Sequence, residues 1–136
     1  MLDSLERALA LRAAPLFHPL PAEALLPVAR LCSVLRLAVD EVLFEEGDLG
    51  DSMYVVVDGS VRITRATATL AELGPGECVG EMAALDWEPR SATVTALKPT
   101  LLIRLERNDL MDLLADYPEL VEALAGVLVD RLRKAR

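Results

Sequence analysis

The sequence predicts a mainly β domain with helices at both ends. Apolar residues recur at helical spacing in residues 1–31, short β-favouring runs follow in residues 32–106, and helical spacing returns in residues 107–136. The chain has 136 residues, of which 53% are hydrophobic, so it can form the core of one ordinary domain without a disulfide or a metal. No internal repeat or low-complexity linker divides it. We therefore expect a single domain over residues 1–136.

Two helices are predicted in residues 1–31. The first ends at Pro15, because proline removes a helical hydrogen bond and clashes with the preceding turn. Pro21 suits the first position of the second helix, and Pro27 is expected to kink or split that helix. Leu25, Val28 and Leu31, the last three of the apolar positions in these helices, should form the core face of the second helix. The full set of apolar positions is Leu2, Leu5, Leu9, Leu25, Val28 and Leu31.

Short β-favouring runs between residues 32 and 106 predict strands, and glycine, proline or acidic residues separate several of them. Asp58-Gly59 lies between two runs and predicts a β-hairpin with a type I′ turn, which requires a positive φ at both central residues. The runs cover residues 34–39, 41–44, 53–57, 61–64, 69–73, 92–96 and 100–105. About six to eight short strands at this spacing indicate an antiparallel sandwich or barrel.

Helical spacing resumes after Glu106 and predicts two C-terminal helices. Asn108 is a suitable N-cap for a helix over residues 109–115, and Pro118 fits the first turn of a last helix. The apolar positions of the two helices are Leu110, Leu113, Leu114, Leu120, Leu124, Val127, Leu128 and Leu132. The apolar stripe of the last helix could pair with a second copy to give a homodimer, or it could pack on the strands, and the sequence favours neither.

The charge balance excludes several classes of function. The chain has 22 acidic and 14 basic residues, which gives a formal net charge of −8. Such a surface repels nucleic acid and anionic lipid, so we expect no nucleic-acid binding by this domain. The first residues, MLDSLERAL, lack the basic start and apolar run of a signal peptide, and the apolar stretch over residues 123–129 is too short to span a bilayer. These features predict a cytoplasmic protein without direct membrane insertion, and the preference for arginine over lysine hints at a bacterial genome.

No arrangement of residues supports catalysis or metal binding. His18 is the single histidine and lies in a turn-like stretch, which argues against a catalytic Ser/His/Asp set and a histidine-rich metal site. Glycine-rich P-loop patterns are absent. Cys32 and Cys78 lack metal-ligand spacing and are expected to be free, buried thiols. We therefore expect a protein that is not an enzyme and holds no metal or cofactor.

Residues 80–94 contain the groups of this sequence that are suited to binding a ligand. A glycine, a helix-favouring stretch over residues 82–85 and Pro89 indicate a short helix inserted between two strands. Free backbone N–H groups at a helix start bind anions, and Arg90 can approach the same anion with two parallel hydrogen bonds. Glu81 can accept a hydrogen bond from a hydroxyl group. The segment therefore suits a ligand with one phosphate and one sugar hydroxyl.

The segment GEMAALDWEPRSATVTA resembles the phosphate-binding cassette of cyclic nucleotide-binding domains, G-E-x-A-L-x(4)-P-R-x-A-T-V. The resemblance extends to EVLFEEGDLGDSMYVVVDGSVRI and LGPGE and covers about residues 10–134. The family includes the catabolite activator protein, the regulatory subunits of cyclic-nucleotide-dependent kinases and the cytoplasmic parts of some channels. The resemblance implies an antiparallel β-roll (a double-stranded β-helix, jelly-roll-like) with N-terminal helices, a short cassette helix and C-terminal helices.

The resemblance also implies roles for individual residues. Arg90 would bind the exocyclic oxygens of a cyclic phosphate, and Glu81 would accept the ribose 2′-hydroxyl. The full set of implied ligand-binding residues is Gly80, Glu81, Met82, Ala83, Arg90, Ser91 and Ala92. Trp87 and Arg136 are candidate base contacts, although Trp87 could instead pack at the rim of the cassette. Gly47, Gly50 and Gly59 would be structural turn glycines.

The implied function is a regulatory ligand-sensing module that binds a cyclic nucleotide, with cAMP ahead of cGMP. Binding would be relayed through the C-terminal helix to an effector domain in the same longer chain or in a partner protein. Ala84 stands where the family usually has a leucine that couples the cassette to this helix, which puts strong coupling in doubt. The alternative is a degenerate member that binds no nucleotide and serves as a protein interaction or dimerisation module. Arg90 would then be a surface arginine paired with Glu88 or Asp86.

Overall fold

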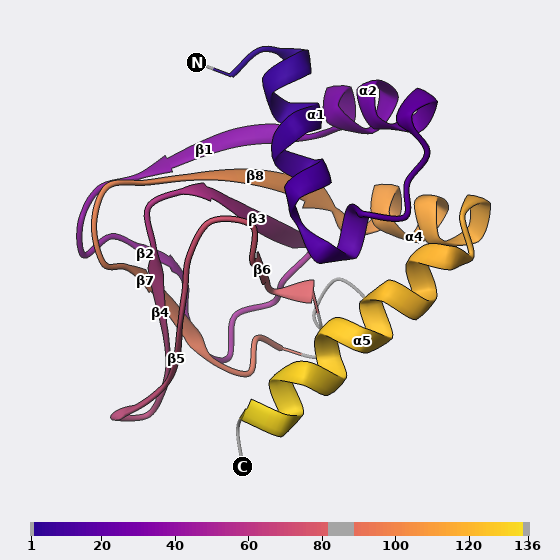
Figure 1. Cartoon of the computed structure of the whole chain (residues 1–136). Helices are drawn as coiled ribbons and strands as arrows, with labels where there is room; N and C mark the ends of the chain where they lie inside the picture. The colour runs from indigo at the N-terminus through magenta and orange to yellow at the C-terminus, as the bar shows by residue number, and fades with distance from the viewer. Residues whose placement is uncertain (1, 82–88, 135–136) are drawn as a thin grey trace.

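The computed structural model describes residues 2–81 and 89–134, and it shows a β-roll of two four-stranded antiparallel sheets with helices at both ends (Figure 1). The first sheet has the order β1-β8-β3-β6 and the second the order β2-β7-β4-β5. The bounds in the first sheet are β1 Ser33–Leu37, β8 Thr100–Glu106, β3 Ser52–Asp58 and β6 Cys78–Val79. Those in the second are β2 Val42–Phe44, β7 Thr93–Ala96, β4 Val61–Arg65 and β5 Ala68–Leu73. The predicted mainly β architecture with helical flanks is confirmed.

The N-terminal part forms α1 (Ser4–Ala13), the single-turn 3-10 helix η1 (Pro15–Phe17) and α2 (Ala22–Leu31). A capping box starts α1, in which the Glu6 backbone N–H donates to Asp3 at 2.8 Å and the Asp3 N–H donates to Glu6 at 3.2 Å. The chain therefore enters α1 with two of its free backbone donors satisfied.

Several details of these helices differ from the prediction. Leu5 and Leu9 of the predicted stripe are each 61% exposed, whereas Leu2, just before α1, packs partly buried against the core. Pro27 does not split α2, which continues past it with Leu25 and Val28, on either side of the proline, buried in the core. Pro21 is the N-cap of α2 and not its first helical residue. Leu31 is half exposed and lies outside the core face predicted for it.

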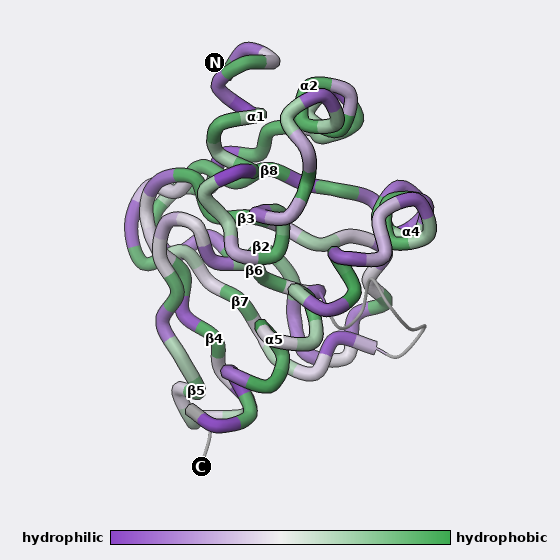
Figure 2. The backbone as a smooth tube through the Cα atoms, turned by 45° about the vertical axis from the view of Figure 1, so that its right-hand side comes forward, coloured by the Kyte–Doolittle hydropathy of each residue, from purple (hydrophilic) through white to green (hydrophobic). Residues whose placement is uncertain are grey.

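The two central strands of the first sheet are buried on both faces. Val55 of β3 and Ile103 of β8 belong to the core shared with the helices, whereas their neighbours Val56 and Leu102 belong to the core between the sheets. Successive side chains of a strand point to opposite faces, so a strand segment covered on both sides is apolar at consecutive positions. This arrangement explains the continuous apolar runs in the sequence, which Figure 2 shows as hydrophobic stretches of the tube.

The Asp58-Gly59 hairpin prediction is wrong. β3 pairs with β6 and β8, whereas β4 pairs with β5 and β7, so this turn carries the chain from one sheet to the other. Gly59 has a φ of +96°, and Asp58 is not among the residues with positive φ. A Cβ at Gly59 would lie 2.6 Å from the Pro99 carbonyl oxygen, so the glycine is required by a close approach of two chain segments. The two-residue strand β6 was also missed, because two residues carry no readable periodicity.

The C-terminal part forms α4 (Arg107–Asp116) and α5 (Glu119–Lys134). Glu106 is the N-cap of α4 without a side-chain hydrogen bond, so the prediction of Asn108 as N-cap is wrong. The helix starts earlier because it follows β8 directly, and the Arg107 N–H donates to the Asp51 carbonyl at 2.7 Å. In Figure 1, α5 crosses the open end of the roll beside β6.

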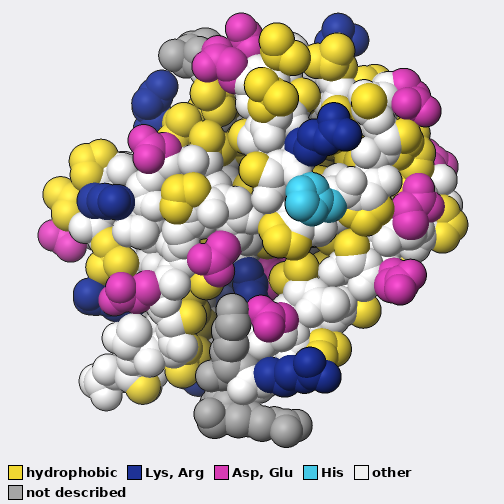
Figure 3. Space-filling view, in the orientation of Figure 1, with side chains coloured by type: hydrophobic (Ala, Val, Ile, Leu, Met, Phe, Trp, Pro, Cys, Tyr) yellow, Lys and Arg dark blue, Asp and Glu magenta, His cyan; other side chains and the backbone are white. Residues whose placement is uncertain are grey.

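The surface agrees with the charge pattern of the sequence. On the face shown in Figure 3, acidic and basic side chains are interspersed and no basic patch gathers. His18 is exposed, and Cys32 and Cys78 are free and buried, as predicted for the two cysteines. No helix in the described ranges is long and apolar enough to cross a membrane.

Candidate ligand site

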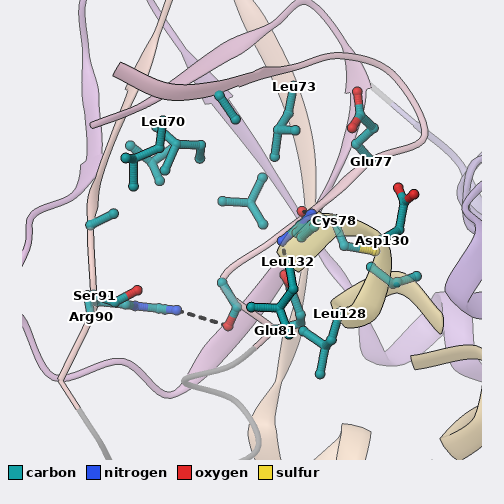
Figure 4. Close-up of a pocket in the computed structure, with 18 of the residues that line it drawn as sticks. Leu70, Leu73, Glu77, Cys78, Glu81, Arg90, Ser91, Leu128, Asp130 and Leu132 are labelled. Atoms are coloured by element: carbon teal, nitrogen blue, oxygen red, sulfur yellow. Dashed lines mark hydrogen bonds and ion pairs between the residues drawn. The ribbon is translucent and has the colours of Figure 1, made fainter. Parts of the chain in front are cut away.

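A cavity of about 900 Å³ lies between the second sheet, the Gly80–Glu81 segment and α5. Figure 4 shows Arg90 at one end of this cavity, Leu128 of α5 toward the other and Leu70 of β5 along its wall. The cavity therefore joins a charged end to an apolar wall and is partly closed by the last helix.

Arg90 forms the charged end of the cavity and is 5% exposed. Its guanidinium donates from Nη2 to the Ser52 carbonyl at 2.8 Å and from Nη1 to the Gly80 carbonyl at 3.1 Å. Its Cζ lies 4.0 Å from the centre of the Phe44 ring. Burial lowers the pKa of Arg90, but a guanidinium stays cationic at neutral pH. These carbonyls use two of its five N–H donors, and Nε makes no hydrogen bond within the described residues.

Glycines make room for this guanidinium. A Cβ at Gly50 would lie 2.2 Å from Arg90 Nε, and a Cβ at Gly80 would lie 2.5 Å from Arg90 Nη1. Gly80 also has a φ of +78°, which residues with a side chain rarely adopt. The backbone of Arg90 is held as well, because its N–H donates to the Asp48 carbonyl at 2.7 Å. Gly50 was expected to be only a turn glycine, and the structure shows that it also accommodates the arginine.

Glu81 is a buried carboxylate beside the same cavity and is 1% exposed. Its Oε1 accepts a hydrogen bond from Arg131 of α5. Its Oε2 is buried and makes no hydrogen bond within the described part of the chain. A buried carboxylate oxygen without a donor is costly, and no donor among the described residues reaches Oε2, which makes it a candidate acceptor for a ligand hydroxyl group.

Arg131 is a site residue that the sequence analysis missed. Its guanidinium donates both to Glu81 Oε1 and to the Cys78 carbonyl, and thereby ties α5 to the start of the cassette. One signal was available in the sequence: Arg131 continues the inward-facing stripe of Leu120, Leu124 and Val127 at helical spacing. A charged residue on the apolar face of a helix indicates a partner buried beneath that face.

Ser91 and Ala92 complete the described part of the cassette and line the cavity next to Arg90. Ser91 is exposed, and its carbonyl accepts a hydrogen bond from Arg65 Nε at 3.0 Å. The structure thus brings five of the predicted residues around one cavity: Gly80, Glu81, Arg90, Ser91 and Ala92. The predicted residues Met82, Ala83, Trp87 and Arg136 lie outside the described residues, as do Ala84, Asp86, Glu88 and the predicted cassette helix.

The wall opposite the charged groups is apolar. Ile63 of β4, Leu70 and Leu73 of β5 and Val94 of β7 line it, and Leu128 and Leu132 of α5 close it from the other side. Apolar walls with a few convergent polar groups are the usual composition of a small-molecule site. The cavity can therefore hold a ligand with an anionic end, a hydroxyl group and a flat apolar part.

The two cysteines should make stability fall at high pH. Burial raises the pKa of the Cys32 and Cys78 thiols from 9.0 to about 12 in each case. Above about pH 9 the unfolded chain loses these protons while the folded chain keeps them, so the free energy of unfolding should fall by about 1.4 kcal/mol per pH unit for each thiol. Urea unfolding between about pH 8 and pH 11 should show a shallower fall in a Cys32→Ala/Cys78→Ala variant. Parallel pH profiles would contradict the prediction, because other titrating groups are common to both proteins.

Comparison with known proteins identifies the family. A sequence model described as the cyclic nucleotide-binding domain matches residues 34–117. The chain belongs to the cyclic nucleotide-binding domain family. This domain is 37% identical, over 92% of its length, to the cyclic AMP receptor protein of Thermus thermophilus. It is also 37% identical, over 88% of its length, to a cyclic nucleotide-gated potassium channel of Mesorhizobium japonicum.

The chain spans 60% of the length of the Thermus receptor and 33% of the length of the channel. Among solved structures, the domain resembles the N-terminal domain of a transcriptional regulator from Streptomyces coelicolor, with 39% identity and a TM-score of 0.75. That match covers 92% of this chain and 91% of the other. The family predicted from the cassette is therefore confirmed.

Proposed function

We propose that this cyclic nucleotide-binding domain is a regulatory sensor that binds cAMP, ahead of cGMP, in the cavity between Arg90 and Glu81. One observation carries the proposal: a buried cation and a buried carboxylate border the same cavity, and each keeps hydrogen-bonding atoms that the described residues do not use. A cyclic nucleotide offers an anion and a hydroxyl group as their partners.

The cyclic phosphate would bind at Arg90. The carbonyls of Ser52 and Gly80 fix the guanidinium, so little side-chain entropy is lost when an anion binds. Ser91 and Ala92, next to Arg90, would add backbone N–H donors, with Met82 and Ala83 completing the phosphate site. Charge-assisted hydrogen bonds of this kind are about twice as strong as neutral ones, which makes Arg90 the main determinant of affinity.

The ribose and the base would occupy the rest of the cavity. Glu81 Oε2 would accept the 2′-hydroxyl, and the apolar wall around Leu70 and Leu73 would cover the face of the base. The Thermus relative is a cyclic AMP receptor protein, which supports cAMP over cGMP. Trp87 and Arg136 remain candidate base contacts.

Arg131 suggests how binding would be relayed. A ligand hydroxyl that reaches Glu81 acts on the carboxylate that holds α5 through Arg131. Binding would therefore shift the population between two docked positions of α5, and an effector domain in a longer chain or in a partner protein would respond. We propose no catalytic role and no nucleic-acid contact for this domain itself.

Calorimetric titration with cAMP and with cGMP tests the proposal, using protein from which co-purified nucleotide has been removed. Saturable binding supports the sensor function, and the ratio of the two affinities gives the base preference. No heat with either nucleotide from folded protein would favour the degenerate alternative, a protein interaction or dimerisation module.

Replacing Arg131 with alanine should release α5 from the cassette. Because one partly exposed ion pair and one hydrogen bond are lost, amide hydrogen exchange in α5 of the free protein should rise about fivefold. The difference in exchange between free and cAMP-bound protein should shrink in the same helix. Arg133→Ala, on an exposed position of α5, is the matched control. An unchanged response of α5 to cAMP in the Arg131 variant would refute the relay.

A further inference from the structure

Within the described residues, the outer edge of β1 is an unpaired sheet edge away from the ligand cavity. The order β1-β8-β3-β6 places β1 at the edge of the first sheet, with β8 as its neighbour on the other side. Along an edge strand, alternate backbone N–H and C=O groups point away from the sheet. The five residues Ser33–Leu37 therefore present a row of backbone groups that a further strand can use.

A groove of about 560 Å³ lies against β1. It is lined by the consecutive residues Cys32, Ser33, Val34, Leu35 and Arg36 and, from α1, by Arg7. Because one wall follows a single strand residue by residue, the groove fits an extended chain, whereas a helix is about 10 Å wide and cannot pair with strand backbone.

Exposed apolar side chains flank the edge. Leu31 is 51% exposed just before β1, and Val39 and Val42 are 53% and 42% exposed just after it. Native edge strands are usually protected by charge, proline or a covering element, and an edge with exposed apolar residues is prone to pairing. An added strand would cover part of this apolar surface.

The charges at the groove select the kind of partner. Arg7 Nη1 donates to the Cys32 carbonyl at 3.2 Å, which fixes a cation at the N-terminal end of β1, and Arg36 adds a second cation toward the other end. Three acids lie nearby: Asp40 and Glu41 beyond the end of β1, and Asp109 beside Cys32. Glu41 accepts a hydrogen bond from the Ala38 backbone N–H. The groove lining itself carries two cations and no acid, on a chain whose net charge is −8.

A second copy of the chain does not fit this edge. In antiparallel pairing of two β1 strands about a twofold axis, the N-terminal end of one strand meets the C-terminal end of the other. Arg7 of one copy would then lie close to Arg36 of the other, and like charges facing each other across strands are destabilising. An acidic chain meets both arginines with opposite charge.

We propose that the outer edge of β1 is a docking site for an extended acidic segment of another protein, which adds to the first sheet as a further antiparallel strand. Backbone hydrogen bonds to Ser33–Leu37 supply affinity, and carboxylates that reach Arg7 and Arg36 supply selectivity. The site is distinct from the ligand cavity and does not depend on nucleotide binding.

The test uses a capped peptide of about eight residues that alternates valine or threonine with glutamate. Amide resonances of residues 33–37 should shift saturably on titration, their hydrogen exchange should slow, and binding should weaken with rising salt. Arg36→Glu should weaken binding by at least about fivefold, whereas Arg133→Glu, the same charge change on α5, should change it by less than about twofold. Both variants should bind cAMP as the parent chain does.

Three outcomes would overturn the proposal. A peptide with lysine in place of glutamate that binds equally well would remove the charge selectivity. Shifts that map away from β1 at millimolar peptide would remove the site. Self-association in sedimentation analysis that Arg36→Glu changes would assign the edge to a second copy.

Discussion

Replacing Arg90 with alanine should weaken cAMP binding by about 30-fold to a few thousand-fold, because truncating one partner of a buried charge pair costs roughly 2–5 kcal/mol. The phosphate would remain in a cavity whose nearby carbonyls of Ser52 and Gly80 repel it. Arg90→Lys should recover only part of the loss, because lysine keeps the charge but not the paired donors. The measurement is calorimetric titration of the three proteins with cAMP.

Arg65→Ala is the matched control for Arg90. Arg65 also lines the cavity, but it is exposed and donates to the Ser91 carbonyl. Its loss should change affinity by less than about fivefold. Thermal unfolding checks that the Arg90 variants remain folded. Equal affinities of the parent and Arg90→Ala chains would show that the phosphate does not bind at Arg90.

Replacing Glu81 with alanine should abolish the contribution of the ribose 2′-hydroxyl to binding. In the parent chain, 2′-deoxy-cAMP should bind about 10- to 100-fold more weakly than cAMP, as expected when a hydrogen bond to a charged group is lost. In Glu81→Ala the two nucleotides should bind within about twofold of each other. Titrating both proteins with both nucleotides closes a double-mutant cycle.

Glu81→Gln separates recognition of the ribose 2′-hydroxyl from the ion pair that holds α5. Glutamine keeps an acceptor oxygen for the hydroxyl but has no charge for Arg131. This variant should retain part of the preference for the 2′-hydroxyl while α5 exchanges faster. A cycle without coupling between Glu81 and the 2′-hydroxyl would overturn the ribose assignment, even if phosphate binding at Arg90 holds.

The sequence predicted those candidate site residues that lie close together in the chain. Gly80, Glu81 and Arg90 belong to one short segment whose spacing resembles the cassette, and the structure gathers them at one cavity. Most of the strands were also predicted, because turn residues separate apolar runs of readable length. The helical flanks followed from apolar spacing in the same way.

Tertiary structure decided what depends on contacts between distant segments. The local sequence at Asp58-Gly59 is typical of a hairpin. The strands on either side, β3 and β4, nevertheless belong to different sheets, because each pairs with strands elsewhere in the chain. Gly50 makes room for Arg90 only once the two segments meet. Arg131 and Glu81 lie 50 positions apart, and only the packing of α5 across the roll brings them together. Local spacing predicts where most helices and strands lie, whereas strand partners, close approaches and the faces that pack depend on the whole core, and no short segment contains that information.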